Sequence, residues 1–65
     1  MTDAEIRSRL DTLRTEHRDL DAAIAALGEF GTPDQMQLAR LKKRKLRLRD
    51  EIAMLEDVLL PDIIA

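Results

Sequence analysis

The stretch GEFGTPDQ, residues 28–35, decides the fold because it separates two long segments of helix-forming residues. It holds both glycines and one of the two prolines of the chain. Glycine and proline are the residues that most strongly interrupt helices. The sequence therefore predicts two helices joined by a short connection, rather than one continuous helix, and such a connection makes the helices antiparallel neighbours.

A heptad pattern runs along both sides of this break, with seam positions that recur at alternating steps of four and three. Before the break the positions are Ile6, Leu10, Leu13, His17, Leu20, Ile24 and Leu27, and after it they are Leu38, Leu41, Lys45, Leu48, Ile52, Leu55 and Leu59. This is the a/d pattern of helices that pack along a shared seam. Only His17 and Lys45 are polar, and both fall on a positions. The pattern predicts an all-α, antiparallel, coiled-coil-like two-helix hairpin.

The capping residues give approximate bounds for both helices. We expect a first helix over about residues 3–27, a turn over 28–32, a second helix over about 33–60 and a short tail over 61–65, all within a single domain, 1–65. Thr2 or Asp3 can cap the first helix, and with Thr2 as the cap Glu5 completes a capping box; Gly28 is the expected left-handed residue at the end of this helix. Thr32 is the expected cap of the second helix, with Pro33 at its first position.

The charges beside the seam are less informative about the register. In an antiparallel pair, e positions face e positions, which suggests contacts between Arg7 and Glu56 and between Asp21 and Lys42. The same rule places Arg14 opposite Arg49, which is an unfavourable pair. Surface pairs contribute little, so the register stays open.

Composition excludes several classes of protein. Of the 65 residues, 45% are hydrophobic and 37% are charged, the net charge is -2, and cysteine is absent. This mixture is typical of long helices and excludes disulfides and cysteine-based metal sites. No apolar run approaches the ~18 residues that a membrane span needs. Asp3 and Glu5 occupy the place of a basic signal-peptide start, so we expect a cytoplasmic protein without a membrane span.

A second apolar stripe suggests self-association. Ala39, Leu46, Ala53 and Leu60 repeat every seven residues at b positions of the second helix. A lone hairpin would leave the two leucines in water. The first helix offers alanines that allow close approach, namely Ala22, Ala23, Ala25 and Ala26. We therefore expect a homo-oligomer, a dimer of hairpins that forms a four-helix bundle.

The polar seam residues have a functional and a structural interpretation. His17 and Asp21 are four residues apart and could both reach one metal ion, but two ligands are too few for a structural site. We interpret His17 as part of a polar layer. The Lys45 ammonium can extend from the seam to an acid such as Asp21, and polar a residues specify register at a cost in stability. We expect no bound metal and no cofactor.

Seven of the ten residues from 40 to 49 are basic. Apart from Lys45, they form a candidate interaction face of Arg40, Lys42, Lys43, Arg44, Arg47 and Arg49. One hypothesis is contact with phosphate or with an acidic partner. The other is a solvated face balanced by Glu16, Asp19 and Asp21. An overall pI of about 5.3 and the absence of stacking aromatic residues weaken the case for nucleic acid.

Catalytic machinery is not recognisable in the sequence. No phosphate-binding loop or paired-carboxylate cleft can be assembled, and Ser8 and the threonines lack a base placed to activate them. We expect no enzymatic activity and no catalytic residues.

Two stretches resemble a known family. His17 to Ile24 is similar to an H-x-x-L-D-x-x-I pattern, and LKKRKLRLRDEI, residues 41–52, is similar to an L-K-K-x-K-L-x-L-K-D-E-I pattern, with Arg49 in place of the usual lysine. Together they resemble the YdcH family of small bacterial proteins over about residues 13–55. The resemblance implies a coiled-coil hairpin and no activity, because the function of that family is unknown. The matching polar positions are His17, Asp21, Lys45, Asp50 and Glu51.

The leading hypothesis is a non-enzymatic helical-hairpin module that interacts with itself or with another protein by coiled-coil packing. The alternative is a nucleic-acid-associated accessory protein that uses the basic face of the second helix. Nothing in the sequence favours a folding scaffold or a membrane-peripheral protein.

Overall fold

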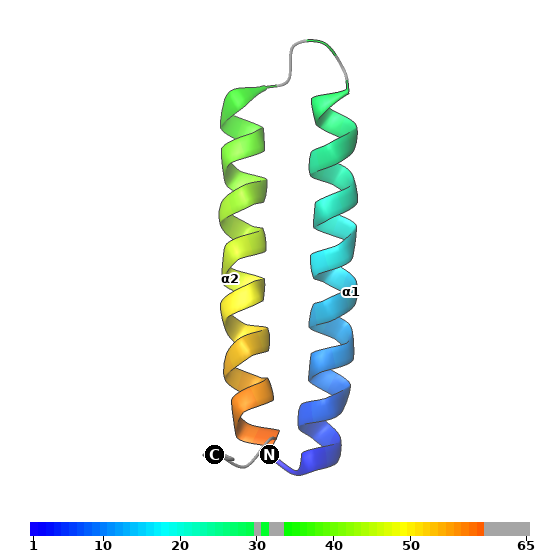
Figure 1. The fold of residues 1–65 in the computed structure, drawn as a ribbon, viewed down its shortest axis with the longest axis vertical. Helices are drawn as coiled ribbons and strands as arrows, with labels where there is room; N and C mark the ends of the chain where they lie inside the picture. Colours follow the sequence, from blue (N-terminus) through cyan, green and yellow to red (C-terminus); the bar gives the residue numbers. More distant parts are fainter. Residues whose placement is uncertain (30, 32–33, 60–65) are drawn as a thin grey trace, which may run out of the picture.

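The computed structural model describes residues 1–29, 31 and 34–59. Helix α1 spans Asp3–Gly28 and helix α2 spans Gln35–Leu59. The two helices lie side by side and run in opposite directions, so the start of α1 and the end of α2 lie at the same end of the molecule (Figure 1). The expected all-α two-helix hairpin is confirmed. Predictions that concern Thr32, Pro33, Leu60 and residues 61–65 lie outside the described residues.

Helix α1 begins with the capping box that the sequence predicts. The backbone N–H of Glu5 donates to Oγ1 of Thr2 over 3.2 Å. The Glu5 carboxylate accepts from the backbone N–H of Thr2 over 3.5 Å. Asp3 and Glu5 also place negative charge in the first turn, where the helix dipole favours it.

Helix α1 ends differently from the expectation for Gly28. Gly28 is the last helical residue, and Glu29 follows with φ -82° and ψ -14°, still close to helical geometry. The N–H of Glu29 reaches the carbonyls of Ala26 and Leu27, so the last turn closes without a left-handed residue. Of the described residues, it is Gly31 that has a left-handed backbone, with φ 54°. The turn therefore begins one residue later than predicted, and the left-handed conformation is found at the second glycine.

The N-cap of α2 is Asp34. Oδ1 of Asp34 accepts from the backbone N–H groups of Met36 and Gln37, over 2.9 and 3.2 Å. Gln35 is the first helical residue, two residues after the start expected at about 33, and Thr32 and Pro33 themselves lie outside the described residues. An aspartate caps as well as a threonine does, and its charge adds a favourable interaction with the helix dipole.

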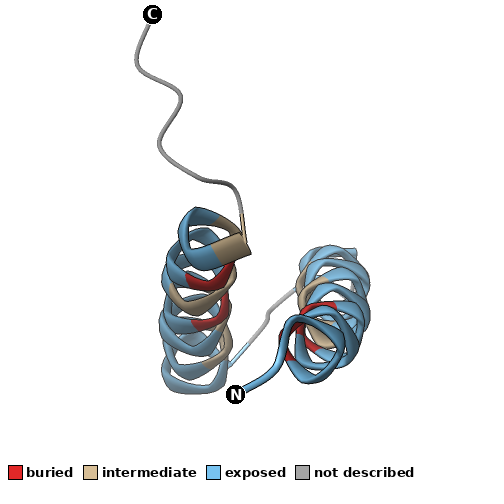
Figure 2. Ribbon diagram, turned by 90° about the horizontal axis from the view of Figure 1, so that it is seen from below, coloured by how far each residue is buried: buried red, intermediate tan, exposed pale blue. Residues whose placement is uncertain are grey.

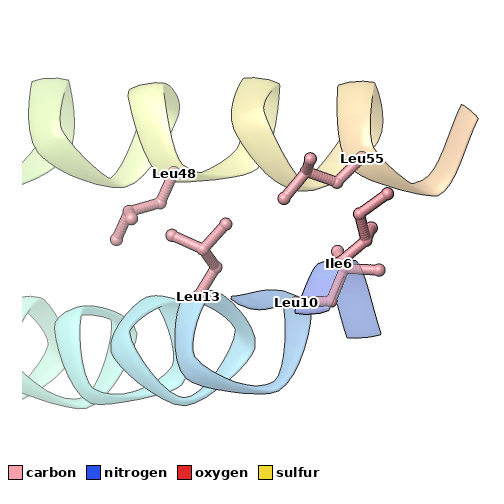
Figure 3. Close-up of a cluster of buried hydrophobic side chains, with 5 residues drawn as sticks. All are labelled: Ile6, Leu10, Leu13, Leu48 and Leu55. Carbon is pink, nitrogen blue, oxygen red and sulfur yellow. The ribbon is translucent and has the colours of Figure 1, made fainter. Parts of the chain in front are cut away.

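The core lies along the predicted seam. Among the described residues, the buried side chains are Ile6, Leu10, Leu13, Leu48 and Leu55. Figure 2 shows that the buried positions of the two helices face each other while the outer surfaces are exposed. Leu13 and Leu48 point toward each other, and Leu55 lies close to Ile6 and Leu10 (Figure 3). Leu13 is fully buried, at 0% exposure, and marks the tightest point of the core.

Burial is unequal along the hairpin. All of the buried side chains come from the first half of α1 and from the second half of α2, at the end that holds the N-terminus. In the half next to the connection, the seam residues Leu20, Ile24, Leu27, Leu38 and Leu41 are only half-buried. The polar pair of His17 and Lys45 lies between these two halves of the seam. The connection half therefore keeps apolar surface in contact with solvent.

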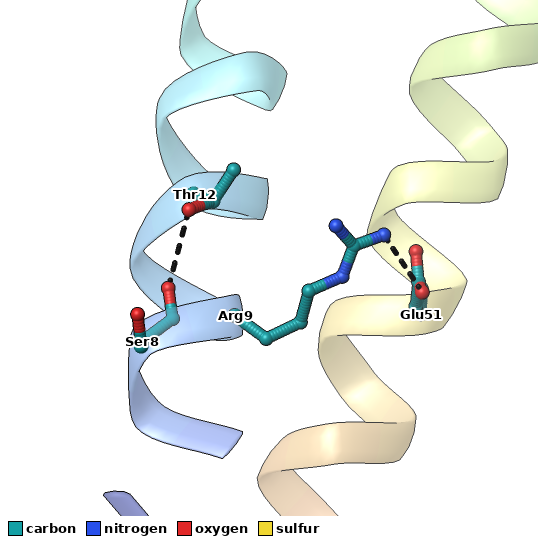
Figure 4. Close-up of polar contacts among 4 residues, drawn as sticks. All are labelled: Ser8, Arg9, Thr12 and Glu51. Carbon is teal, nitrogen blue, oxygen red and sulfur yellow. Dashed lines mark hydrogen bonds and ion pairs between the residues drawn. The ribbon is translucent and has the colours of Figure 1, made fainter. Parts of the chain in front are cut away.

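Ion pairs join the helices on both sides of the seam. Nη2 of Arg14 lies 2.8 Å from Oε2 of Glu56, and Nη2 of Arg9 lies 3.3 Å from Oε1 of Glu51 (Figure 4). The predicted partner of Glu56, Arg7, is one heptad from Arg14 and lines the same hollow, but Arg14 makes the contact. All four side chains are a third to a half exposed, so each pair contributes under about 1 kcal/mol.

Candidate functional site

The polar layer of the seam is built from α1 and α2 together. Nζ of Lys45 contacts Oδ1 of Asp21, which is the acid that the sequence suggested for it; the pairing of Asp21 with Lys42 was therefore wrong. The hydrogen bond from Lys45 lowers the pKa of the Asp21 carboxyl below its ordinary value of 3.8, and the charges of Lys45 and His17 act in the same direction. Lys45 reaches this carboxylate because a long side chain can leave the seam while its stem stays packed.

His17 lies half-buried on α1 beside this pair. Within the part of the chain that the structure describes, no group of three or more histidine, cysteine, aspartate or glutamate side chains is placed to hold a metal ion. His17 and Asp21 therefore have no third ligand there, and Asp21 is engaged by Lys45. The geometry of these residues fits a structural polar layer better than a metal site.

Two threonine hydroxyl groups of α1 donate to the helix backbone. Oγ1 of Thr12 donates to the carbonyl of Ser8 over 3.2 Å (Figure 4). Oγ1 of Thr15 donates to the carbonyl of Asp11 over 3.0 Å. Such bonds satisfy an exposed threonine in the middle of a helix. The hydroxyl hydrogens of Thr12 and Thr15 therefore point to backbone carbonyls rather than to a side-chain base.

The described part of the chain forms hollows beside the seam, and a pair of them bears on function. One is lined by Arg7, Leu10, Asp11, Arg14, Glu56 and Leu59. The other, which we call the basic hollow, is lined by His17, Ile24, Lys42, Lys45, Leu46 and Arg49. Both sets consist of a, b and e positions of the two helices, so both hollows lie on the same side of the seam.

The basic segment of α2 is exposed and largely unpaired. Its six candidate residues outside the seam are all exposed: Arg40, Lys42, Lys43, Arg44, Arg47 and Arg49. Among the described residues, the only ion pair made by residues 40–49 is that of Lys45 with Asp21. Balance by Glu16 and Asp19 is therefore not seen at contact distance. The basic segment presents concentrated positive charge on a protein whose net charge is -2.

The second apolar stripe of α2 faces solvent, as its heptad positions require. Leu46 is 53% exposed, and Ala39 and Ala53 are exposed one heptad before and after it. Leu60, the fourth member of the predicted stripe, lies outside the described residues. Met54 and Val58 are also exposed, at 58% and 62%, on a neighbouring strip of the same helix. On α1, the predicted alanine surface of Ala22, Ala23, Ala25 and Ala26 is exposed along its whole length.

Sequence reasoning treated the polar seam, the basic face and the apolar stripe as separate features. The structure joins one part of each, because His17, Lys42, Leu46 and Arg49 line a single hollow. The signal was present in the spacing, since Lys42, Lys45, Leu46 and Arg49 follow at steps that keep them on one side of a helix. What the spacing alone did not give was the place of His17 and Ile24 on the opposite wall.

Comparison with known proteins gives one match. The model of the family described as "Protein of unknown function (DUF465)" matches residues 10–56, which is more than two thirds of the chain. The matched range contains most of the seam, the polar layer and the whole basic segment. Neither the curated proteins nor the solved structures contain a match to this chain. In the described residues, neither helix has a stretch that is long and apolar enough to cross a membrane.

Proposed function

The chain belongs to the YdcH-like family of small proteins of unknown function (DUF465), and from the surfaces of its hairpin we propose a non-enzymatic interaction module of the cytoplasm. The module acts by coiled-coil packing, and its first partner is a second copy of the chain. The resulting assembly is a four-helix bundle made of two hairpins. A protein partner that offers a similar helical surface would bind in the same way.

One observation carries this proposal: Leu46 is 53% exposed between two exposed alanines at heptad spacing. A leucine flanked by small residues at this spacing fits a hole on a neighbouring helix. The core of the single hairpin is small, because burial is complete only near one end. A short chain of this kind gains stability when association buries more apolar surface.

Charge favours one arrangement of the two hairpins. Contact between two copies of α2 would bring two basic segments together, and like charges repel. Contact between α2 and α1 of the partner copy places the basic segment beside the exposed Asp19 and Glu29. The same arrangement packs Leu46 on the alanine surface of α1. We therefore propose that α2 of each copy packs on α1 of the other, with the connections at the same end.

Sedimentation equilibrium tests the proposal with a matched pair of variants. Leu46→Glu removes the central apolar contact and adds a charge, whereas Met54→Glu makes the same change at an equally exposed residue outside the stripe. Leu46 is about half exposed, so its burial in both copies contributes about 2 kcal/mol to the dimer. We expect Leu46→Glu to weaken dimerisation at least about 30-fold and Met54→Glu to leave it nearly unchanged.

Two results would contradict self-association through this stripe. One is a folded wild-type protein that stays monomeric at the highest concentration that can be measured. The other is an equal loss of dimer in both variants, which would show that the effect comes from added negative charge rather than from the stripe. Circular dichroism of each variant separates loss of association from loss of helix.

A second candidate function rests on a different observation, the six exposed and unpaired basic residues of the segment 40–49. In this alternative the chain is a nucleic-acid-associated accessory protein. Its affinity for nucleic acid would then survive physiological salt, whereas purely diffuse attraction falls steeply as salt rises. Replacement of Lys42, Lys43, Arg44 and Arg47 by glutamine would remove this binding without unfolding the hairpin. Weak, salt-sensitive binding without sequence preference would favour the interaction module.

A further inference from the structure

The basic hollow has the shape and the charge of a small-anion site. Its volume is about 360 Å³, and its lining contains three cationic side chains, one imidazole and no carboxylate. Pockets for small molecules begin at about this size. The positive charges come from α2, and His17 lies on the opposite wall on α1. A ligand in this hollow would therefore contact both helices.

The other hollow on the same side of the molecule provides a comparison within the protein. It is similar in size, about 420 Å³, but Asp11 and Glu56 balance its two arginines. Arg14 is already held by Glu56 at 2.8 Å. An anion in that hollow would face two carboxylates in the lining itself, whereas the basic hollow has none in its lining and only Lys45 is engaged by a carboxylate, that of Asp21, so electrostatics favours the basic hollow.

The cations of the basic hollow differ in how far they are already paired. Lys45 is held by Asp21, whereas Lys42 and Arg49 make no ion pair within the described residues. Lys42 and Arg49 are one heptad apart, so their backbones are about 10 Å apart along the helix axis. A ligand with two anionic groups can engage both side chains at once, with Lys45 between them. Charge-assisted hydrogen bonds of this kind are among the stronger contacts that a protein makes.

The apolar members of the lining strengthen this attraction. Ile24 is half-buried on α1, and Leu46 lies on α2 beside Lys42 and Lys45. Apolar walls exclude some of the water that would otherwise screen the charges.

From these observations we infer that the basic hollow binds a small ligand with at least two phosphate-type anionic groups, held mainly by Lys42 and Arg49. The size of the hollow favours a small molecule over a nucleic-acid strand, which would follow the whole basic segment. Every lining residue comes from one chain, so the hollow does not need a second copy to be complete, although Leu46 is also the residue that we propose for self-association. The inference goes beyond the proposed interaction module because it gives the hairpin a ligand.

The experiment uses inorganic pyrophosphate and follows His17, the only histidine of the chain, by NMR. Pyrophosphate is added to the full chain at constant ionic strength, with sodium chloride as the reference, and at a protein concentration that gives one species in sedimentation. We expect saturable changes in the ring signals of His17 and in the side-chain signals of Lys42 and Arg49. Chloride at the same ionic strength should leave them nearly unchanged.

Two double variants with the same change in charge locate the site. Lys42→Gln with Arg49→Gln alters the hollow, whereas Lys43→Gln with Arg47→Gln alters the same segment outside the lining. Each lost contact to a charged group corresponds to about tenfold or more in affinity. We expect the first variant to lose at least about tenfold in affinity for pyrophosphate. We expect the second to change it by less than about threefold, since only distant, screened charge is removed.

Three results would overturn the inference. The first is equal loss in both double variants, which would mean diffuse attraction by the basic segment. The second is saturable binding that leaves the His17 signals unmoved, which would place the ligand elsewhere. The third uses a short single-stranded oligonucleotide as a second probe. If it binds more tightly than pyrophosphate at equal ionic strength and both variants weaken it, the ligand is a strand along the whole segment.

Discussion

Nζ of Lys45 on α2 contacts Oδ1 of Asp21 on α1, across a seam in which, apart from Lys45 and His17, the residues are apolar. The contact lies near the middle of the hairpin, between the buried half of the seam and the half-buried half. Both side chains keep solvent contact, at 37% and 52% exposure, so neither charge is fully desolvated. The pair helps to set the register of one helix relative to the other, which is the usual role of a polar residue at an a position.

The pair makes the stability of the hairpin depend on pH in the acid range. The hydrogen bond from Lys45 lowers the pKa of Asp21 in the folded state below its ordinary value of 3.8. The contribution of this carboxylate to stability is therefore present above the unfolded pKa and is lost as pH falls through the folded pKa. We expect Asp21→Asn to be less stable than wild type near neutral pH and the difference to shrink in strong acid. Thermal unfolding over a pH series measures this, and parallel profiles for the two proteins would contradict it.

Removal of the polar layer should stabilise the hairpin. Replacing His17 or Lys45 by leucine fills the seam with apolar surface, and Lys45→Leu leaves behind an Asp21 that is already half exposed. We expect a gain of about 1 kcal/mol for either change, or about 4–8 °C in Tm for a domain of this size. The same variants should form mixed oligomers or helix registers, because the polar residue that specifies a single arrangement is lost. Sedimentation would detect the mixed oligomers as more than one species. Two strongly destabilised variants that stay single species would instead show that the polar layer is a satisfied network.

Leu13 is the side chain on which the core depends most. It is fully buried between the helices, so Leu13→Ala removes transfer energy and leaves a cavity. We expect a loss of about 2–5 kcal/mol in the free energy of unfolding, measured by urea denaturation. Leu46→Ala is the control, because it deletes the same atoms from a residue that is 53% exposed. In dilute monomer, Leu46→Ala should lower the free energy of unfolding much less than Leu13→Ala does. An equal loss in both variants would contradict a core centred on Leu13.

The two glycines should respond to alanine in opposite directions. A Cβ at either position meets nothing within 4 Å, so the backbone decides the outcome. Gly31 has φ 54°, where an alanine is strained, and Gly31→Ala should cost about 1 kcal/mol. Gly28 is the last residue of α1, and Gly28→Ala should stabilise the helix by up to about 1 kcal/mol. Thermal unfolding of the two variants side by side decides this, and stabilisation by Gly31→Ala would contradict the turn geometry.

The sequence allowed the hairpin and its seam to be predicted because heptad spacing is a local property. Positions such as Leu13 and Leu48 could be assigned to one seam from their periodicity alone, and both are buried. The contact of Lys45 with Asp21 was also suggested by the sequence, as an example of an acid that the long lysine side chain can reach from the seam. The ends of the helices at the turn were harder to predict from the sequence. Residues 28–35 contain two glycines that could be left-handed and two residues, Thr32 and Asp34, that could cap the second helix. Gly31 is left-handed where Gly28 was expected to be, and Asp34 caps α2, whereas the expected cap, Thr32, lies outside the described residues.

By itself, the sequence determined two antiparallel helices and the residues that form the seam between them. It also determined that the apolar stripe that contains Leu46 lies outside this seam. Local periodicity and capping chemistry are sufficient for these features. Only the tertiary structure decided that Arg14 rather than Arg7 meets Glu56, and that the buried seam residues lie in one half of the hairpin. It alone brought His17 of α1 to the same hollow as Lys42 and Arg49 of α2. These relationships depend on the axial register of two helices, which weak surface charges do not specify and close packing of Leu13 against Leu48 does.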